Sequence, residues 1–451
     1  MRSWPSALTL SERFILLPGS TAHSRQDLAE RRLKRWKAGP VFANNSSLLP
    51  ERLAADGISE AALCTLLGTP ASEIVDPLST PPEWAARILE AADRQTASSQ
   101  VMQAIQESQA GLGSSAGFLR AASSFLSQAH EQLCAGIDRI KGSSRELAFD
   151  PATIEGMLLQ NALGQILGML NRTFVLELNV ARVQGQLTGE TSEERFASFL
   201  ERLGSPEVVT ALWEEYPVLA RQVVIALQQW VDSSLEFLGR LQGDWNEIQS
   251  RFFPGHAPGH LARLKMGAGD RHQHGRSVAI AEFSSGAKLV YKPRALAVDK
   301  HFQELLDWVN ARHRDLSFRT LKLLAQDGYG WTEYIDSESC DCEDQVRAFY
   351  RRQGGLLALL YLLHATDLHF ENLVACGEHP VLVDLETLFH PDLYFPPESD
   401  ASFLGQKEIA MSRERNPARK KYCHTQAKRN CRKREPCHHT QKKPRRTQKK
   451  S

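Results

Sequence analysis

The stretch Tyr361–Leu388 is Y-L-L-H-A-T-D-L-H-F-E-N-L-V-A-C-G-E-H-P-V-L-V-D-L-E-T-L. It begins at the end of a helical pattern over residues 343–364 whose last two turns are almost wholly apolar, so we expect that helix to be buried. A polar loop, Asp367–Asn372, follows the helix, and a short apolar strand over residues 380–385 then ends in carboxylates. Polar residues at the ends of a buried helix and a buried strand indicate a candidate site for chemistry.

Two runs upstream of this stretch alternate apolar and polar residues, at Ser277–Phe283 and at Ala287–Lys292. The Ser-Ser-Gly turn between them makes the pair a predicted β-hairpin. A helix over residues 296–311 and a strand over residues 318–325 are expected next. This part of the chain is therefore expected to mix short strands with helices.

Residues from about 50 to 250 show a helical pattern, in which apolar residues recur every three or four positions. Pro, Gly or Ser separates the segments. The expected helices span residues 84–108, 116–141, 151–170, 193–203, 206–215 and 218–249. Together with the strands, they predict an α+β protein with a large helical N-terminal portion.

The composition is ordinary for a soluble globular protein: 451 residues, 42% hydrophobic and 24% charged. Eight scattered cysteines are too few for a disulfide scaffold and are typical of a reducing compartment. Glu12 and Arg13 interrupt the apolar N-terminus before a signal-peptide core can form. The longest apolar run, Leu356–Leu363, is too short to span a bilayer. These features predict a cytoplasmic protein with no membrane partner.

The net charge of +1 conceals an uneven distribution. Residues 407–451 carry 17 Lys and Arg against three Glu, about +14, which leaves about −13 on the rest. Beyond Met411 there is no Val, Leu, Ile, Phe or Trp, so this segment cannot bury enough apolar surface to fold. We expect four regions: a basic N-terminal segment at 1–45, a helical region at 46–265, a partial catalytic core at 266–405 and a disordered basic tail at 406–451.

Polar residues of the catalytic core occur in the order that phosphoryl transfer from ATP requires. In kinases a strand lysine neutralises the phosphates, a loop Asp acts on the hydroxyl, and an Asn and a second Asp hold magnesium ions. Here Lys292 ends a predicted strand, and Asp367 and Asn372 are five positions apart. Asp384 follows twelve residues later, although there is no GxGxxG loop and no Asp-Phe-Gly. Each residue alone is more often a solvated charge, a cap or a turn residue than part of a site, so the order and spacing carry the kinase-like hypothesis.

The stretch Tyr361–Leu388 closely resembles the dehydratase domain of the LanM-type class II lanthipeptide (lantibiotic) synthetases. Five further segments resemble that family in the same order, within a resemblance that covers residues 130–395. They are F-V-L-E-L-N-V-A-R (174–182), E-Y-P-V-L-A-R (215–221), G-D-R-H-Q-H-G-R-S-V (269–278), V-Y-K-P-R (290–294) and G-Y-G-W-T-E-Y (328–334).

The resemblance implies a lipid-kinase-like, two-lobed catalytic domain with added helical elements. Such an enzyme binds ATP and Mg²⁺ and phosphorylates Ser and Thr of a ribosomally made precursor peptide, which it holds by its leader. It then eliminates the phosphate to give dehydroalanine and dehydrobutyrine. In the family a separate zinc cyclase domain forms the lanthionine rings, and because no cyclase segment is expected in this chain, no zinc is expected either.

The resemblance also assigns roles to residues at matching positions. The implied roles are ATP binding for Lys292, Arg294 and Glu304, catalysis for Asp270, His272, Asp367 and His369, and magnesium coordination for Asn372, Asp384 and Glu386. Asp367 and His369 would lie near the hydroxyl, whereas Asp270 and His272 would serve elimination. By kinase analogy, Glu304 is a candidate ion-pair partner of Lys292.

The resemblance ends near residue 405, where members of the family continue for several hundred residues. We therefore expect an N-terminal fragment with an incomplete C-lobe, whose helix at 352–366 exposes an apolar face. The tail leaves three alternatives. One is a zinc site, which fits no known ligand spacing, formed by Cys423, His424, Cys431, Cys437, His438 and His439. The others are nonspecific nucleic-acid binding through Lys and Arg and a shifted reading frame.

Three functions stay open for the chain as a whole. The leading one is an ATP- and Mg²⁺-dependent peptide dehydratase. The alternative is a catalytically inactive truncated remnant or peptide-binding module, which an incomplete C-lobe favours. A generic kinase is disfavoured because the sequence has no Gly-rich loop.

Overall fold

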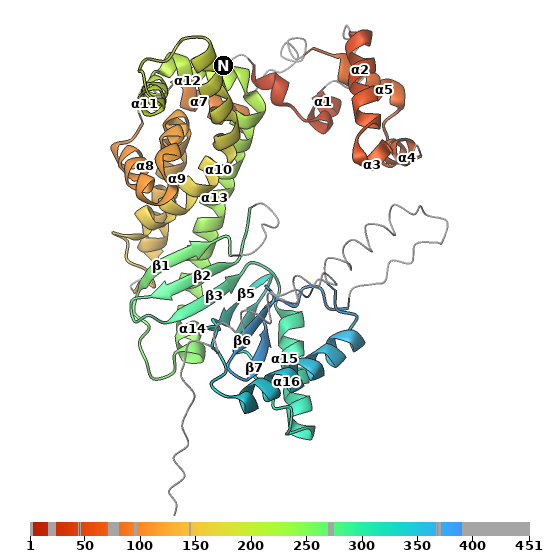
Figure 1. Ribbon diagram of the computed structural model, residues 1–451, viewed down its shortest axis with the longest axis vertical. Helices are drawn as coiled ribbons and strands as arrows, with labels where there is room; N and C mark the ends of the chain where they lie inside the picture. The colour runs from red at the N-terminus through yellow and green to blue at the C-terminus, as the bar shows by residue number, and fades with distance from the viewer. Residues whose placement is uncertain are drawn as a thin grey trace, which may run out of the picture. The chain divides into compact units, whose positions relative to one another are not determined.

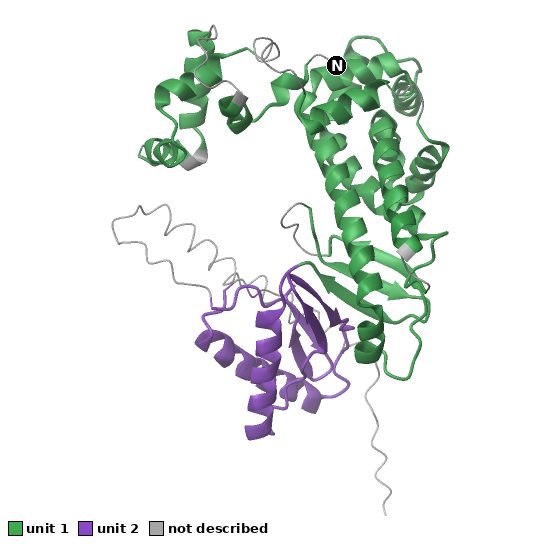
Figure 2. Ribbon diagram, turned by 180° about the vertical axis from the view of Figure 1, so that it is seen from behind, with its two compact units in different colours: residues 1–293 green, residues 294–451 purple. Residues whose placement is uncertain are grey.

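The computed structural model describes residues 3–16, 24–43, 45, 47–70, 81–93, 97–143, 146–268, 275–366, 368 and 371–389. The chain divides into two compact units, Met1–Pro293 and Arg294–Ser451, which Figure 2 shows in green and purple. The region boundaries expected at 45/46, 265/266 and 405/406 stay predictions, and the tail lies outside the described residues. Each unit is described by itself.

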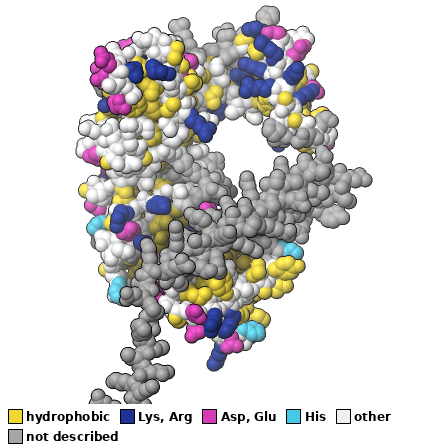
Figure 3. Space-filling view, viewed as in Figure 1, with side chains coloured by type: hydrophobic (Ala, Val, Ile, Leu, Met, Phe, Trp, Pro, Cys, Tyr) yellow, Lys and Arg dark blue, Asp and Glu magenta, His cyan; other side chains and the backbone are white. Residues whose placement is uncertain are grey.

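Short helices open the first unit. They are η1 (Trp4–Ala7), α1 (Leu10–Leu16), α2 (Gln26–Lys37), α3 (Pro40–Ala43), α4 (Leu48–Ala55) and α5 (Glu60–Gly68). Leu49, Leu53, Leu63 and Leu67 form a small core between α4 and α5. The basic residues predicted near the N-terminus lie on α2, where they are exposed, and Figure 3 shows Lys and Arg side chains gathered over these helices.

A larger helical part follows in the first unit (Figure 1). Its elements are α7 (Glu83–Asp93), α8 (Ser99–Leu112), η2 (Ser114–Ala122), α9 (Ser123–Ser143), α10 (Ile154–Val183), α11 (Ser192–Arg202), α12 (Pro206–Glu215), α13 (Pro217–Gly243) and α14 (Trp245–Phe252). Its core is apolar, and the buried ring of Phe118 contacts the rings of Phe174 and Phe199. The predicted helical pattern is confirmed, because the three- and four-residue spacing of apolar residues places them on one face of each helix.

Several predicted helix boundaries are wrong. The expected helix over 84–108 is two helices, α7 and α8, and Ser98 caps the second by accepting a hydrogen bond from the Val101 backbone N–H at 3.2 Å. The expected helix over 218–249 is also two, since α13 ends at Gly243 and α14 starts at Trp245. The helix expected over 151–170 runs on to Val183 as α10. Apolar periodicity alone does not locate such ends, because it continues across a break between helices.

A three-stranded antiparallel meander completes the first unit: β1 (Leu261–Met266), β2 (Ala279–Phe283) and β3 (Lys288–Lys292). The predicted hairpin of β2 and β3 is confirmed, and Gly286 in its turn has φ of +84°, a conformation that suits glycine. The Asn161 side chain on α10 donates a hydrogen bond to the Leu264 backbone oxygen at 3.0 Å, which joins the sheet to the helices.

The second unit contains short strands and two helices. The elements are α15 (Ala297–Arg312), β4 (Leu323–Gln326), β5 (Tyr329–Glu333), α16 (Glu343–Leu362), β6 (Leu373–Cys376) and β7 (His379–Leu382). The predicted helices over 296–311 and 343–364 are confirmed. The strand expected over 318–325 starts only at Leu323, and β5 pairs with it as an antiparallel hairpin that was not predicted.

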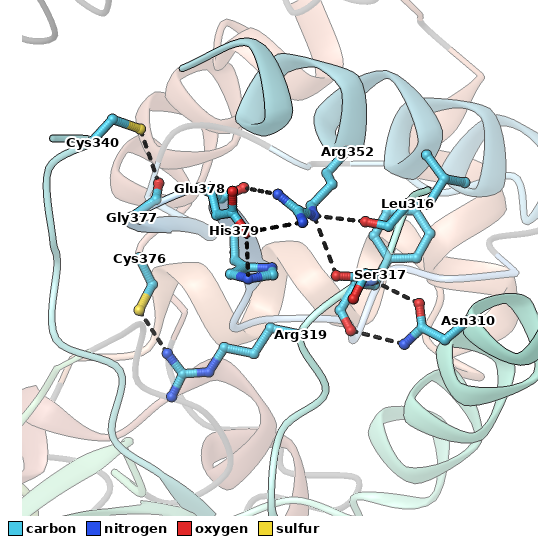
Figure 4. Close-up of polar contacts among 11 residues, drawn as sticks. Asn310, Leu316, Ser317, Arg319, Cys340, Arg352, Cys376, Gly377, Glu378 and His379 are labelled. Carbon is cyan, nitrogen blue, oxygen red and sulfur yellow. Dashed lines mark hydrogen bonds and ion pairs between the residues drawn. The ribbon is translucent and has the colours of Figure 1, made fainter. Parts of the chain in front are cut away.

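Arg352 on α16 is buried and binds two loops of the second unit (Figure 4). Its Nε donates to the backbone oxygens of Leu316 at 2.6 Å and Ser317 at 3.2 Å. Its Nη1 donates to the Glu378 backbone oxygen at 2.9 Å, and Nη2 donates to Glu378 Oε1 at 3.1 Å. Because Glu378 lies in the β6–β7 turn, this guanidinium holds that hairpin against α16.

The expectation that helix α16 is buried is wrong for its last turns. Leu357, Tyr361 and Leu362 are 69%, 82% and 72% exposed, whereas Leu356 is buried in the core of the second unit. The exposed apolar face that was expected on this helix is therefore present. None of the described helices combines the length and the apolar character needed to cross a bilayer.

Candidate functional site

The open end of the β6–β7 hairpin brings together two residues that are twelve positions apart. Leu373 pairs with Leu382, so the chain enters and leaves the hairpin at the same end. The Val383 backbone N–H donates to the Asn372 backbone oxygen at 3.0 Å, one step beyond the strands. Antiparallel pairing thus places Asn372 and Asp384, two predicted magnesium ligands, at one end of a two-stranded ribbon.

The segment after β7 also binds the end of α16. The Thr366 backbone N–H donates to the Thr387 oxygen at 3.2 Å, and the Thr387 hydroxyl donates to the Thr366 oxygen. The Phe389 N–H donates to the Leu363 oxygen at 2.9 Å. Residues on both sides of the predicted catalytic pair therefore bind the segment that carries Asp384, although Asp367 and His369 themselves lie outside the described residues.

Arg294 joins this segment to the start of α15. Its Nη1 donates to Asp299 Oδ2 at 2.6 Å and its Nη2 donates to Asp299 Oδ1 at 3.2 Å, so the two side chains form a bidentate ion pair. Nη2 also donates to Asp384 Oδ1 at 3.0 Å, and Nε lies 3.7 Å from Glu386 Oε2. One guanidinium therefore contacts three carboxylates.

The carboxylates of this group hold Arg294 in its charged state. Burial opposes the charge of Arg294, but the hydrogen bond and charge of Asp299 and the charges of Asp384 and Glu386 outweigh it, so the pKa of Arg294 is raised. Asp299 is only 5% exposed, whereas Asp384 and Glu386 are 38% and 40% exposed. Carboxylate and amide oxygens are the ligands that Mg²⁺ prefers. By type, the oxygen donors of Asn372, Asp384 and Glu386 suit a magnesium ion, and their role as its ligands stays a prediction.

The other predicted residues fall in different places. Lys292 ends β3 in the first unit and is 6% exposed. Glu304 lies on the exposed face of α15, where its Oε2 is 2.8 Å from His301 Nδ1, and it does not join the Arg294 group. Asp270 and His272 lie outside the described residues. The roles of these four residues stay predictions.

Asp299 is the member of this group that sequence reasoning missed. It lies in the first turn of α15, where a carboxylate is favoured by the helix dipole, and it follows Arg294 by five residues. An acidic residue at a helix start is common, so this signal alone does not separate a buried partner of Arg294 from an ordinary helix-end charge.

Two comparisons with known proteins bear on this site. Residues 216–426 match a family model described as "Domain of unknown function (DUF4135)". The "Lacticin 481/lactococcin biosynthesis protein LcnDR2" of Lactococcus lactis subsp. lactis is 28% identical over 244 residues. That match covers 51% of this chain, and the chain spans about a quarter (25%) of the length of this relative. The matches confirm the resemblance to LanM-type biosynthesis proteins that the sequence motifs indicated.

Proposed function

We propose that the chain acts in lanthipeptide biosynthesis, as the domain that phosphorylates Ser and Thr of a ribosomally made precursor peptide and converts them to dehydroalanine and dehydrobutyrine. Its catalytic part would be lipid-kinase-like, and its place would be the cytoplasm, where such a peptide is made. The proposal rests on the resemblance together with one structural observation. That observation is that the Val383–Asn372 backbone hydrogen bond holds Asn372 at the hairpin end next to Asp384, where Arg294 contacts both Asp384 and Glu386.

ATP and Mg²⁺ are the cofactors of this proposal. When bound, the metal neutralises charge that builds up on the phosphates during transfer. Asn372, Asp384 and Glu386 would hold it through oxygen atoms. Arg294 would hold the Asp384 carboxylate in place through its hydrogen bond, and Asp299 would fix Arg294 in turn.

The reaction has two steps on the peptide. In the first, Asp367 would accept the proton of the substrate hydroxyl, whose oxygen bonds to the γ-phosphorus while the bond from that phosphorus to ADP breaks. In the second, a base removes the proton from the α-carbon, a carbon–carbon double bond forms, and phosphate leaves with the C–O bonding electrons. Asp270 and His272 would serve this second step, and Lys292 would neutralise the nucleotide phosphates.

The intact mass of a cognate precursor peptide tests the proposal after incubation with the protein, ATP and Mg²⁺. A gain of one phosphoryl group per modified residue, or a loss of one water, would support it. Asp384→Asn should slow the change at least ~100-fold, because metal stabilisation is worth several kcal/mol and each 1.4 kcal/mol is tenfold in rate. Asp341→Asn, an exposed carboxylate outside the site, should act like the wild type.

A second candidate is a module that binds the peptide without modifying it. The exposed Leu357, Tyr361 and Leu362 of α16 favour it, because an apolar surface of this kind is suited to a peptide or protein partner. A folded protein that binds the precursor but leaves its mass unchanged in the presence of ATP and Mg²⁺ would establish this candidate and reject the first.

A further inference from the structure

Three potential metal ligands meet in the helical part of the first unit, away from the motifs of the proposed catalytic site. His130 and Cys134 lie one turn apart on α9, and Glu155 lies in the first turn of α10. Their ligand atoms, one from each side chain, all lie within 4.8 Å of one another. Residues four apart on a helix face the same side, so the two α9 side chains form a chelating pair and Glu155 completes it from a second helix.

The distance within the pair fits a tetrahedral metal centre. His130 Nε2 is 3.6 Å from Cys134 Sγ. Zinc binds imidazole nitrogen at about 2.0–2.1 Å and thiolate sulfur at about 2.3 Å, and at a tetrahedral angle these bonds place the two atoms about 3.5 Å apart. The sulfur also lies 3.9 Å from His130 Nδ1, almost as far as from Nε2, so it lies beside the ring, and the imidazole must turn to aim a nitrogen lone pair at an ion shared with Cys134.

Burial and charge also suit a metal ion. His130 is 5% exposed, and burial lowers its pKa, so its imidazole is neutral and has a free lone pair at neutral pH. Burial first, and then the Glu155 carboxylate, raise the pKa of the Cys134 thiol to about 12. A bound divalent cation would offset the effect of the Glu155 carboxylate and lower the pKa of the Cys134 thiol, because its positive charge favours the thiolate.

Lys141 is the cation that now neutralises Glu155. Its Nζ lies 3.7 Å from Glu155 Oε1 and 3.0 Å from Asp138 Oδ1. Since Lys141 keeps Asp138 as a partner, Glu155 can turn from the ammonium to a metal ion without leaving Lys141 unpaired.

We propose that His130, Cys134 and Glu155 bind a thiophilic divalent transition metal ion such as Zn²⁺. Binding forms a metal–sulfur bond as the Cys134 S–H bond breaks, and the proton goes to solvent. The ion, one thiolate and one carboxylate then sum to zero charge, and water fills the fourth position. The nitrogen and sulfur donors distinguish this site from the oxygen donors of Asn372, Asp384 and Glu386.

The site would join α9 to the start of α10 and stabilise the helical part of the first unit. It is independent of the proposed peptide chemistry and of any cyclase. The absence of zinc expected from the sequence concerned a cyclase domain, so it does not bear on these three residues.

The test is a titration of the reduced, metal-free full chain with Co²⁺, which gives a thiolate-to-metal absorption band only when a cysteine sulfur coordinates. The variants are Cys134→Ser and, as matched control, Cys64→Ser, a cysteine of similar exposure on α5. Any Co²⁺ binding by the cysteines that both variants keep contributes equally to their two titrations. We expect wild type and Cys64→Ser to bind about one Co²⁺ more than Cys134→Ser, with the band reduced only in Cys134→Ser.

A second variant protects the test against misfolding. Glu155→Gln keeps the size of the side chain and should weaken Zn²⁺ binding at least ~10-fold, as loss of groups that support a metal site does. Calorimetry of Zn²⁺ binding in buffers of different ionisation enthalpy should show about one proton released per ion at neutral pH. Equal Co²⁺ binding by Cys134→Ser and wild type, or Zn²⁺ affinity unchanged in Glu155→Gln, would overturn the proposal.

Discussion

The two compact units are stabilised in different ways. The helical part of the first unit packs through apolar side chains such as Phe118, Phe174 and Leu163, all of which are almost fully buried. The second unit has shorter elements, and two arginines, Arg294 and Arg352, bind the ends of its strands and helices. Long amphipathic helices pack mainly through apolar surface, whereas four-residue strands and their loops leave polar backbone groups that a guanidinium can satisfy.

The largest effect should follow from Arg294→Ala. It breaks the ion pair of Arg294 with the buried Asp299 carboxylate and removes the cation beside Asp384, so we expect the free energy of unfolding to fall by about 3 kcal/mol, the lower end of the range for breaking a buried pair because Arg294 is partly exposed. Urea unfolding measures it. Arg263→Ala, which removes an exposed arginine from a pair with Glu282, is the control and should cost less than about 1 kcal/mol. Equal losses of unfolding free energy in Arg294→Ala and Arg263→Ala would show that the ion pairs of Arg294 do not stabilise the second unit more than an exposed pair stabilises the first.

Arg352→Ala should have the next largest effect. It leaves the backbone oxygens of Leu316 and Glu378 without this donor, and we expect a loss of about 2–3 kcal/mol in unfolding free energy. Arg347 lies on the same helix with 70% of its side chain exposed, so Arg347→Ala should change stability by no more than about 0.5 kcal/mol. A loss below 1 kcal/mol in Arg352→Ala, measured in the same way, would show that the loops do not depend on this arginine.

The smallest effect concerns a charged contact in the first unit. Burial acts to raise the pKa of Glu12, but hydrogen bonds from Arg221 and Thr9 outweigh it, so the pKa is lowered. A carboxylate with a lowered pKa stabilises the fold above its unfolded pKa of about 4.3, and this stabilisation is lost as the pH falls through the folded pKa. At pH 7 the free energy of unfolding of the wild type should exceed that of Glu12→Gln by less than about 1 kcal/mol. This difference should vanish in acid, once Glu12 is protonated in the folded protein. A difference in unfolding free energy that does not shrink as the pH falls below about 4.3 would contradict this assignment.

Much of the fold was predictable because periodicity reports which face of an element is buried. The β2–β3 hairpin and helices α15 and α16 follow from it directly. The hairpin of β4 and β5 was missed, although Asp327-Gly328 is a two-residue turn signal and Gly328 has φ of +75°. A four-residue strand carries too few alternations to be recognised by period alone.

The candidate sites also differ in how far the sequence alone could predict them. Asn372 and Asp384 occur within one motif, so their spacing predicted a shared site, to which the resemblance added Glu386; this site stays a prediction. His130, Cys134 and Glu155 are brought together by the packing of α9 and α10, and no motif spacing contains that information. Asp299 lies between these cases, close to Arg294 in the chain but paired with it only through the fold.

We propose that the open end of the β6–β7 hairpin binds magnesium and a nucleotide. Calorimetric titration with a non-hydrolysable ATP analogue and Mg²⁺ tests it most directly, on wild type, Asp384→Asn and the exposed control Asp341→Asn. We predict that wild type and Asp341→Asn bind equally and that Asp384→Asn binds at least ~10-fold more weakly. Equal affinity in Asp384→Asn, or no binding by the folded wild type, would contradict the claim.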